Sequence, residues 1–112
     1  MKMVYKYPLD IHDEVVVMMP NGARVLSVQV QNGRPYIWAA VDPNELTLEE
    51  RWFRIAGTGH PIQDDVVDGF IGSIQMYDGK LVFHVFEMNA YDIRRDNPLA
   101  KVHAEQGDSQ QL

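Results

Sequence analysis

The feature that most constrains the fold is a β-hairpin motif that occurs twice. Residues 27–38 read Ser-Val-Gln-Val-Gln-Asn-Gly-Arg-Pro-Tyr-Ile-Trp, and residues 73–84 read Ser-Ile-Gln-Met-Tyr-Asp-Gly-Lys-Leu-Val-Phe-His, without a gap in their alignment. Asn-Gly and Asp-Gly favour a two-residue type I′ turn, because both central residues of that turn take positive φ. The sequence therefore predicts two similar hairpins, which arise either by internal duplication or by convergence on the same residues.

The turns also predict the cross-strand pairs, which run from Gln31–Arg34 to Leu26–Ala39 in the first hairpin and from Met76–Leu81 to Ser73–His84 in the second. Cross-strand partners lie on the same side of a sheet, so these pairs predict which side chains share a face. We expect one face of each hairpin to be core and the other to be polar or aromatic. The expected core faces are Leu26, Val28, Val30, Ile37, Ala39 and Val41 in the first hairpin, and Ile74, Met76, Leu81, Phe83 and Val85 in the second. The opposite face of the first hairpin carries Ser27, Gln29, Gln31, Arg34, Tyr36 and Trp38. That of the second carries Ser73, Gln75 and His84 together with the more apolar Ile71, Val82 and Phe86.

The remaining segments add short strands rather than long helices. Alternating or β-branched runs predict strands at residues 4–7, 14–19 and 51–56, and an acidic connection follows at residues 63–68. Thr47 and Glu50 have the spacing of a capping box, which predicts about one turn of helix. Together these elements predict a mainly β fold, a compact antiparallel β-sandwich or small barrel of about seven strands.

The domain ends, in this reading, near residue 89. Residues 1–89 are expected to form the β domain, and residues 90–112 a C-terminal extension that is partly helical or disordered. Asn97-Pro98 suits the start of a short helix, because Asn is a good N-cap and Pro a good first helical residue. The polar residues 106–112 are typical of disorder.

Composition excludes several classes of function. The chain has no cysteine, so disulfides, cysteine metal ligands and cysteine nucleophiles are absent. A net charge of −6 argues against nonspecific binding to nucleic acid, which depends on Lys and Arg. No segment reaches the roughly 20 apolar residues that span a bilayer, and no secretion signal is present, so we expect a protein that is neither exported nor membrane-bound. The four histidines lie on separate segments and form no His-x-x-x-His pair, so their spacing predicts no metal site. No cofactor is expected.

The first candidate ligand site is the Gly57-Thr58-Gly59-His60 loop. Its glycines allow backbone amides to approach an anion, Thr58 and His60 offer hydrogen bonds, and Arg54 lies just before it. The alternative is an ordinary turn. His60 with Asp64 or Asp65 has the residue types of a general base, but no partnered nucleophile follows, so no catalytic residue is predicted.

The second candidate is the polar face of the first hairpin. Trp38 and Tyr36, flanked by Ser27, Gln29 and Arg34, have the character of a surface that stacks a planar ligand. The alternative is that Trp38 is buried against protein. In the second hairpin, His84 opposite Ser73 has the composition of a catalytic dyad, although a hydrogen-bonded structural pair is the simpler interpretation.

Several short motifs carry a resemblance to a family. They include Tyr5-Lys6-Tyr7-Pro8-Leu9, Val41-Asp42-Pro43, Gly57-Thr58-Gly59-His60-Pro61-Ile62 and His84-Val85-Phe86-Glu87. Over residues 4–87 the chain resembles a family of small uncharacterised phage and prophage proteins that carry a domain of unknown function. The resemblance implies a phage accessory protein in the cytoplasm of a bacterial host, and no catalytic residue can be transferred from it.

These observations lead to three functional hypotheses. The first is a small noncatalytic protein that binds a host protein, such as a host-takeover or anti-defence factor. The second is a protein that sequesters a nucleotide or another small anionic ligand through residues 57–60. The third is a minor virion or assembly component. We also expect a homo-oligomer, because the hairpins offer more apolar and aromatic surface than so small a core can bury.

Overall fold

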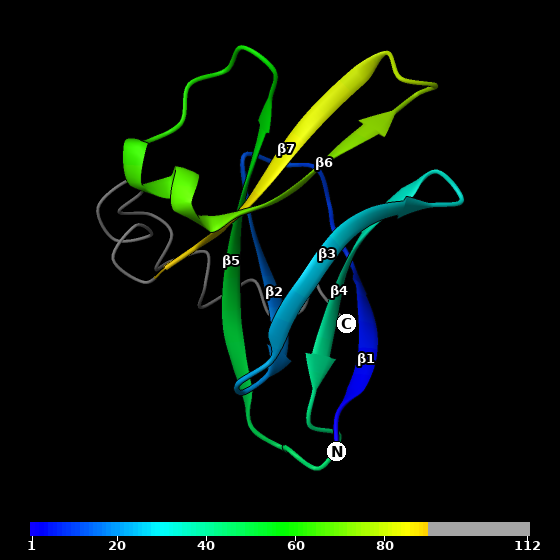
Figure 1. The fold of residues 1–112 in the computed structure, drawn as a ribbon, viewed down its shortest axis with the longest axis vertical. Helices are drawn as coiled ribbons and strands as arrows, with labels where there is room; N and C mark the ends of the chain where they lie inside the picture. The colour runs from blue at the N-terminus through cyan, green and yellow to red at the C-terminus, as the bar shows by residue number, and fades with distance from the viewer. Residues whose placement is uncertain (90–112) are drawn as a thin grey trace.

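The computed structural model describes residues 1–89, which form two antiparallel sheets (Figure 1). One sheet has the strand order β1-β4-β3 and the other β2-β5-β7-β6. The strands are β1 (Met3–Pro8), β2 (Glu14–Pro20), β3 (Arg24–Gln31), β4 (Arg34–Val41), β5 (Leu48–Gly57), β6 (Phe70–Met76) and β7 (Leu81–Met88), with a 3-10 helix η1 (Asp64–Gly69) between β5 and β6. The predicted mainly β fold of seven antiparallel strands is confirmed, in the form of a small β-sandwich. The predicted C-terminal extension and its short helix lie outside the described residues.

The main core lies between the two sheets. Its fully buried side chains come from both, with Ile37 and Val41 on β4, and Val17, Phe53 and Val85 on β2, β5 and β7. Burial of Tyr7 in this core raises the pKa of its phenol above 10.0, and the nearby Tyr5 adds to the shift. Of the side chains predicted for the inward face of the first hairpin, all lie in or against this core except Leu26.

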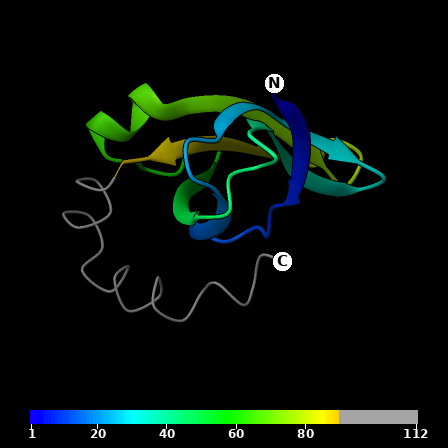
Figure 2. The same cartoon turned by 90° about the horizontal axis from the view of Figure 1, so that it is seen from below.

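The second sheet also buries residues on its other face. Val16, Trp52 and Met88 form one small cluster there, and Ala56, Val66 and Phe86 form another. Val66 belongs to η1, so this helix covers part of the outer face of the sheet. The helix and β1 lie on opposite sides of the molecule in both views (Figures 1 and 2).

Both predicted turns and the register beside them are confirmed. Asn32 and Gly33 have φ of 53° and 79°, and Asp78 and Gly79 have φ of 58° and 82°. In the first hairpin the predicted pairs run from Gln31–Arg34 to Ser27–Trp38, and in the second from Met76–Leu81 to Ser73–His84.

The predicted register fails beyond these pairs, because each hairpin contains a β-bulge. In β3 the register shifts between Val25 and Ser27, so Val25 takes the place opposite Ala39 that was predicted for Leu26. Leu26 is consequently 49% exposed and is not part of the core. In β6 the shift falls between Phe70 and Gly72, so the two hairpins resemble each other even in having a bulge near the same place.

Two further predictions are wrong. Leu81 was assigned to the core but is exposed, because it lies beside the turn at the projecting tip of the second hairpin (Figure 1). The capping-box helix at residues 47–50 is absent: Leu48 begins β5 and pairs with Pro20, while the carbonyl of Thr47 accepts a hydrogen bond from the amide of Asn21 at 2.8 Å. Pairing with β2 satisfies this backbone, and tertiary pairing therefore overrides the local helix signal.

The two sheets approach each other closely at β3 and β6, which belong to different sheets. A Cβ on Gly72 would lie only 3.1 Å from Cγ1 of Val28, so the absence of a side chain at Gly72 permits this approach. The contact also brings the two bulges to the same region of the molecule.

Candidate functional site

A groove of about 790 Å³ opens where the two bulges meet. Val25 and Leu26 reach it from the bulge in β3, and Phe70 and Ile71 reach it from the bulge in β6. Phe70 is 54% exposed, although its ring also contacts that of Phe86 at a centroid distance of 5.5 Å. Bulges redirect side chains out of the regular alternation of a strand. Here Leu26 and Phe70 are exposed in the groove, whereas Val25 and Ile71 line it and also pack against the main core.

The rest of the groove is strongly acidic. Five carboxylates and a single arginine line it. The carboxylates are Glu49 and Glu50 of β5, Asp65 and Asp68 of η1, and Glu87 of β7. The groove therefore combines an apolar surface with a negative electrostatic potential, which favours a ligand that carries positive charge.

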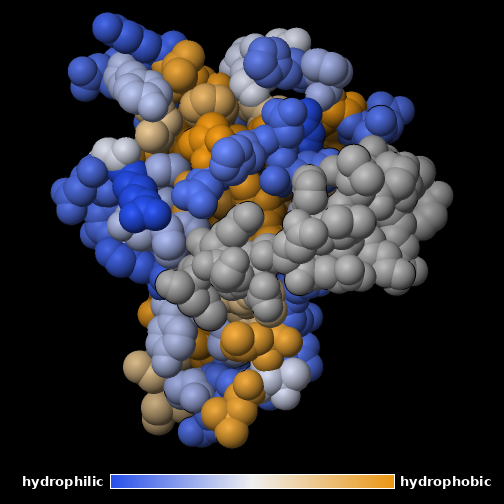
Figure 3. Space-filling view, turned by 180° about the vertical axis from the view of Figure 1, so that it is seen from behind, coloured by the Kyte–Doolittle hydropathy of each residue, from blue (hydrophilic) through white to orange (hydrophobic). Residues whose placement is uncertain are grey.

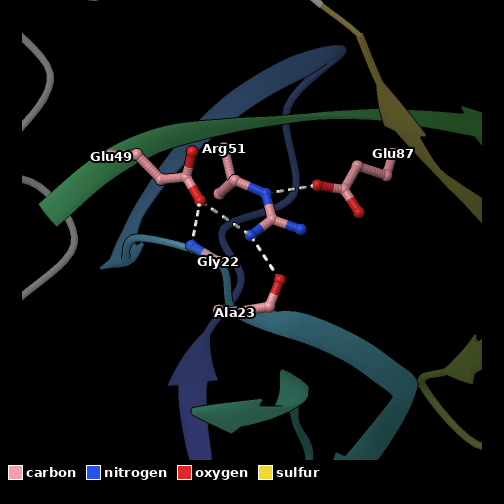
Figure 4. A network of polar contacts seen from close by, with 5 residues as sticks. All are labelled: Gly22, Ala23, Glu49, Arg51 and Glu87. Atoms are coloured by element: carbon pink, nitrogen blue, oxygen red, sulfur yellow. Dashed lines mark hydrogen bonds and ion pairs between the residues drawn. The ribbon is translucent and has the colours of Figure 1, made fainter. Parts of the chain in front are cut away.

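Arg51 is the one arginine of this groove, and its guanidinium is held by the protein (Figure 4). Nε donates to Oε2 of Glu87 at 2.6 Å, and Nη1 donates to the carbonyl of Ala23 at 2.6 Å. Nη1 also lies 3.3 Å from Oε2 of Glu49, which accepts a hydrogen bond from the amide of Gly22 at 2.8 Å. Arg51 thus ties the β2–β3 turn to β5 and β7 and supports the wall of the groove.

The predicted ligand loop at residues 57–60 is a tight β-turn. The amide of His60 donates to the carbonyl of Gly57 at 3.0 Å, and Gly59 has φ of 91°, which favours glycine at the third position of a type II turn. Gly57 needs no positive φ, and its Cα faces the imidazole of His60. The glycine signal in the sequence is therefore explained by turn geometry at Gly59.

Arg54, which was predicted to serve this loop, is engaged with the backbone. Its guanidinium donates to the carbonyls of Asp13 at 3.1 Å, Ile55 at 2.7 Å and Pro61 at 3.1 Å. It also lies 3.7 Å from the carboxylate of Asp13. These contacts fasten the loop to the start of β2 through the Nη1 and Nη2 atoms of Arg54.

Thr58 belongs to a different arrangement, in which one imidazole lies between two hydroxyls. Ser73 Oγ is 2.7 Å from Nδ1 of His84, and Thr58 Oγ1 is 2.7 Å from Nε2 of the same ring. A hydroxyl can either donate or accept, so both ring nitrogens can be hydrogen-bonded at once, with roles that depend on the tautomer. The predicted Ser73–His84 pair is thus formed. With Thr58 it links the loop to the second hairpin.

Tyr36 and Trp38, the other predicted ligand residues, lie on a separate surface. Their ring centroids are 6.3 Å apart on β4, and the Nζ atom of Lys6 lies 4.6 Å from the Tyr36 ring and 5.7 Å from the Trp38 ring. Trp38 belongs to the first sheet, whereas residues 57–60 follow β5 of the second sheet. The structure therefore divides the predicted ligand residues between two places.

The sequence does not predict the groove, because its residues come from β3, β5, β7 and the continuous segment of η1 and β6. A signal was present in the apolar residues Leu26, Phe70 and Ile71, which precede the repeated Ser-x-Gln motif, but the predicted register assigned Leu26 to the core. Within residues 1–89, no group of three metal-ligating side chains comes together. Nor does this part of the chain contain a helix with the length and apolar character to cross a membrane.

Comparison with known proteins identifies a family. Residues 1–95 match a family described as "Domain of unknown function (DUF7352)". No curated protein and no solved structure matches the chain.

Proposed function

The chain belongs to the DUF7352 family, and we propose that it is a noncatalytic binding protein whose acidic groove holds a basic, apolar segment of a partner protein. The observation that carries the proposal is the meeting of both β-bulges at one groove. Bulges are common beside functional sites, where they redirect side chains. In this chain Leu26 and Phe70 are exposed next to carboxylates, beside the two bulges.

The chemistry of the groove defines the partner segment. Leu26 and Phe70 offer apolar contacts, which supply most of the affinity at protein interfaces when water is excluded from them. The surrounding carboxylates attract Lys and Arg and disfavour acidic partners. A segment in which basic and apolar residues alternate closely meets both requirements.

We also propose a biological setting for this binding, which rests on the resemblance to phage and prophage proteins. In that setting the partner is a host protein in the bacterial cytoplasm, and binding it serves host takeover or blocks a defence system. The alternative setting is a minor virion or assembly component. Mass spectrometry of purified particles distinguishes the two, because a virion component copurifies with the particle and a cytoplasmic factor does not.

Leu26→Ser tests the groove without disturbing the core. Short peptides selected by display on the full chain are expected to be rich in Lys, Arg and apolar residues, and Leu26→Ser should weaken their binding about ten-fold. Fluorescence anisotropy of a labelled selected peptide gives the dissociation constants. The matched control is Leu46→Ser, because Leu46 is 91% exposed and does not line the groove.

The electrostatic part of the proposal has its own pair of variants. Asp68→Lys should lower the affinity for the same peptide and reduce the salt dependence of its binding. Asp10→Lys, at an exposed position outside the groove, should change the affinity and the salt dependence only by a small long-range effect. Selection of peptides without basic residues, or equal binding by Leu26→Ser and Leu46→Ser, would overturn the proposed function.

A homo-oligomer is also proposed, with β1 as its contact. This strand is an edge of the first sheet, and its apolar residues Met3, Val4 and Tyr5 are exposed. Exposed apolar edge strands favour pairing with a strand of another chain. Apolar side chains (orange) also reach the surface on the back of the molecule (Figure 3). Light scattering should give a mass above the 12.8 kDa of one chain.

Val4→Lys should return the protein to the monomer, because a lysine on an edge strand opposes strand pairing. Val67→Lys is the matched control, since Val67 is exposed on η1, on the other side of the molecule from β1. A 12.8 kDa particle for the unsubstituted protein at high concentration would contradict the proposed oligomer.

A further inference from the structure

We propose that the outer face of the β1-β4-β3 sheet binds a nucleoside phosphate, with the base against Tyr36 and Trp38 and the phosphate near Lys6 and Arg34. This site is distinct from the acidic groove. Its existence does not depend on the proposed protein partner.

The first support is the distribution of charge. The three strands of this sheet contain Lys6, Arg24 and Arg34 and no acidic residue, although the whole chain has 16 acidic residues and a net charge of −6. The register places Arg24 opposite Ala40, Lys6 opposite Trp38 and Arg34 opposite Gln31, on the face that points away from the core. An anion that approaches this protein is therefore attracted to this sheet and repelled by the acidic groove.

The second support is the pair of aromatic rings. Tyr36 and Trp38 lie side by side on β4 with their planes inclined at 53°, and both remain partly exposed. Lys6 lies across them and donates from Nζ to Oε1 of Gln31 at 2.7 Å. A lysine on an edge strand is mobile enough to turn toward a phosphate, and this movement uncovers the rings for stacking.

The third support is an unsatisfied donor. Within residues 1–89, the indole Nε1 of Trp38 is a buried side-chain nitrogen without a hydrogen-bond partner. Buried donors are nearly always paired, so such an atom calls for an acceptor. The edge of a nucleobase offers carbonyl and ring-nitrogen acceptors for this donor, and the Nζ atom of Lys6 lies 5.7 Å from the centroid of the same ring.

The second hairpin shows that the rings are not required by the hairpin motif. Where the first copy has Tyr36 and Trp38, the second has Val82 and His84, and the strand pairing is equivalent from Val30–Pro35 and Met76–Leu81 outward to Ser27–Trp38 and Ser73–His84. The aromatic pair is therefore an addition to the framework. This comparison also provides a control, because Lys80 occupies the position in the second copy that Arg34 occupies in the first.

Nitrogen–proton correlation spectra of the full chain test the proposal. The chain has two tryptophans, so two indole signals are expected, and Trp38→Phe assigns them. AMP, GMP, CMP, UMP and a single-stranded oligothymidylate are the probes, and they distinguish a free nucleotide from a single strand as the source of the nucleoside phosphate. The Trp38 indole signal should shift on titration with a probe that binds. The signal of the buried Trp52 should not.

The variants separate stacking from charge. Tyr36→Leu should weaken binding about five-fold or more through loss of stacking. Lys6→Gln and Arg34→Gln change exposed positions and leave the core intact. Each should lower the affinity for the probe about three-fold and reduce the salt dependence of binding. Lys80→Gln should leave the affinity unchanged. The proposal is overturned if no probe shifts the Trp38 signal, if adenosine binds as well as AMP, or if Lys80→Gln weakens binding as much as Arg34→Gln.

Discussion

Gly69→Ala is expected to destabilise the protein by at least about 3 kcal/mol, a large fraction of the folding free energy of a domain of this size. A Cβ at Gly69 would lie 1.9 Å from the carbonyl oxygen of Glu87 and 3.0 Å from its carbonyl carbon. Both contacts are with backbone, so no rotation of a side chain can relieve them. The junction of η1 and β6 would have to move away from β7, and the ring contact between Phe70 and Phe86 would move with it.

Thermal unfolding followed by circular dichroism measures this effect. The midpoint should fall by more than about 10 °C, given about 4 °C or more per kcal/mol for a small domain. Gly57→Ala is the matched control, because an added Cβ there meets only the exposed imidazole of His60, at 3.2 Å, and Gly57 has no positive φ. Its midpoint should change little or rise slightly. Similar midpoints for the two variants would contradict the packing described at Gly69.

Arg51→Met is expected to lower the free energy of unfolding by about 2 kcal/mol. The substitution keeps most of the side-chain stem but removes the donors to the carbonyl of Ala23 and the carboxylate of Glu87. A partly buried carboxylate that loses its partner is destabilising, although the partial exposure of Glu87 limits the cost. Urea unfolding should show a lower midpoint at an unchanged slope.

A second substitution in the same network separates the ion pair from general packing. Arg51→Met combined with Glu87→Leu removes both charged partners, so it should recover a large part of the lost stability. The single variant Glu87→Leu, which leaves Arg51 with the carbonyl of Ala23 and with Glu49, should be less destabilising than Arg51→Met. If the double variant is less stable than Arg51→Met, the network does not act as described.

Much of the framework was predictable from the sequence because it depends on neighbouring residues. Asn32-Gly33 and Asp78-Gly79 specify turns with two positive φ values, and these turns set the pairing of the residues beside them. Alternation in β5 places Phe53 and Ile55 on the same face, which lies in the main core. The aromatic and basic face of the first hairpin could also be predicted, because alternate residues of a strand point to the same side of the sheet.

The groove could not be predicted in this way. Its residues are separated by long stretches of sequence, and they meet only because β3 and β6 approach each other at Gly72. The same limit applies to Arg54, whose partners include the carbonyl of Asp13, and to Thr47, whose capping signal yields to the pairing of β2 and β5. In each case a contact between distant segments decides the role of the residue.

The sequence by itself therefore determined the two hairpins, their turns, the mainly β class and most of the core, since these follow from local backbone preference and alternation. Only the tertiary structure decided the position of the bulges, the exposure of Leu26 and the use of Arg51 and Arg54. The physical reason is that cross-strand pairs counted outward from a turn are correct only as far as the pairing of the two strands stays regular. A bulge adds one residue to a strand and bends it, and from that residue onward the face of each side chain depends on the packing of the two sheets.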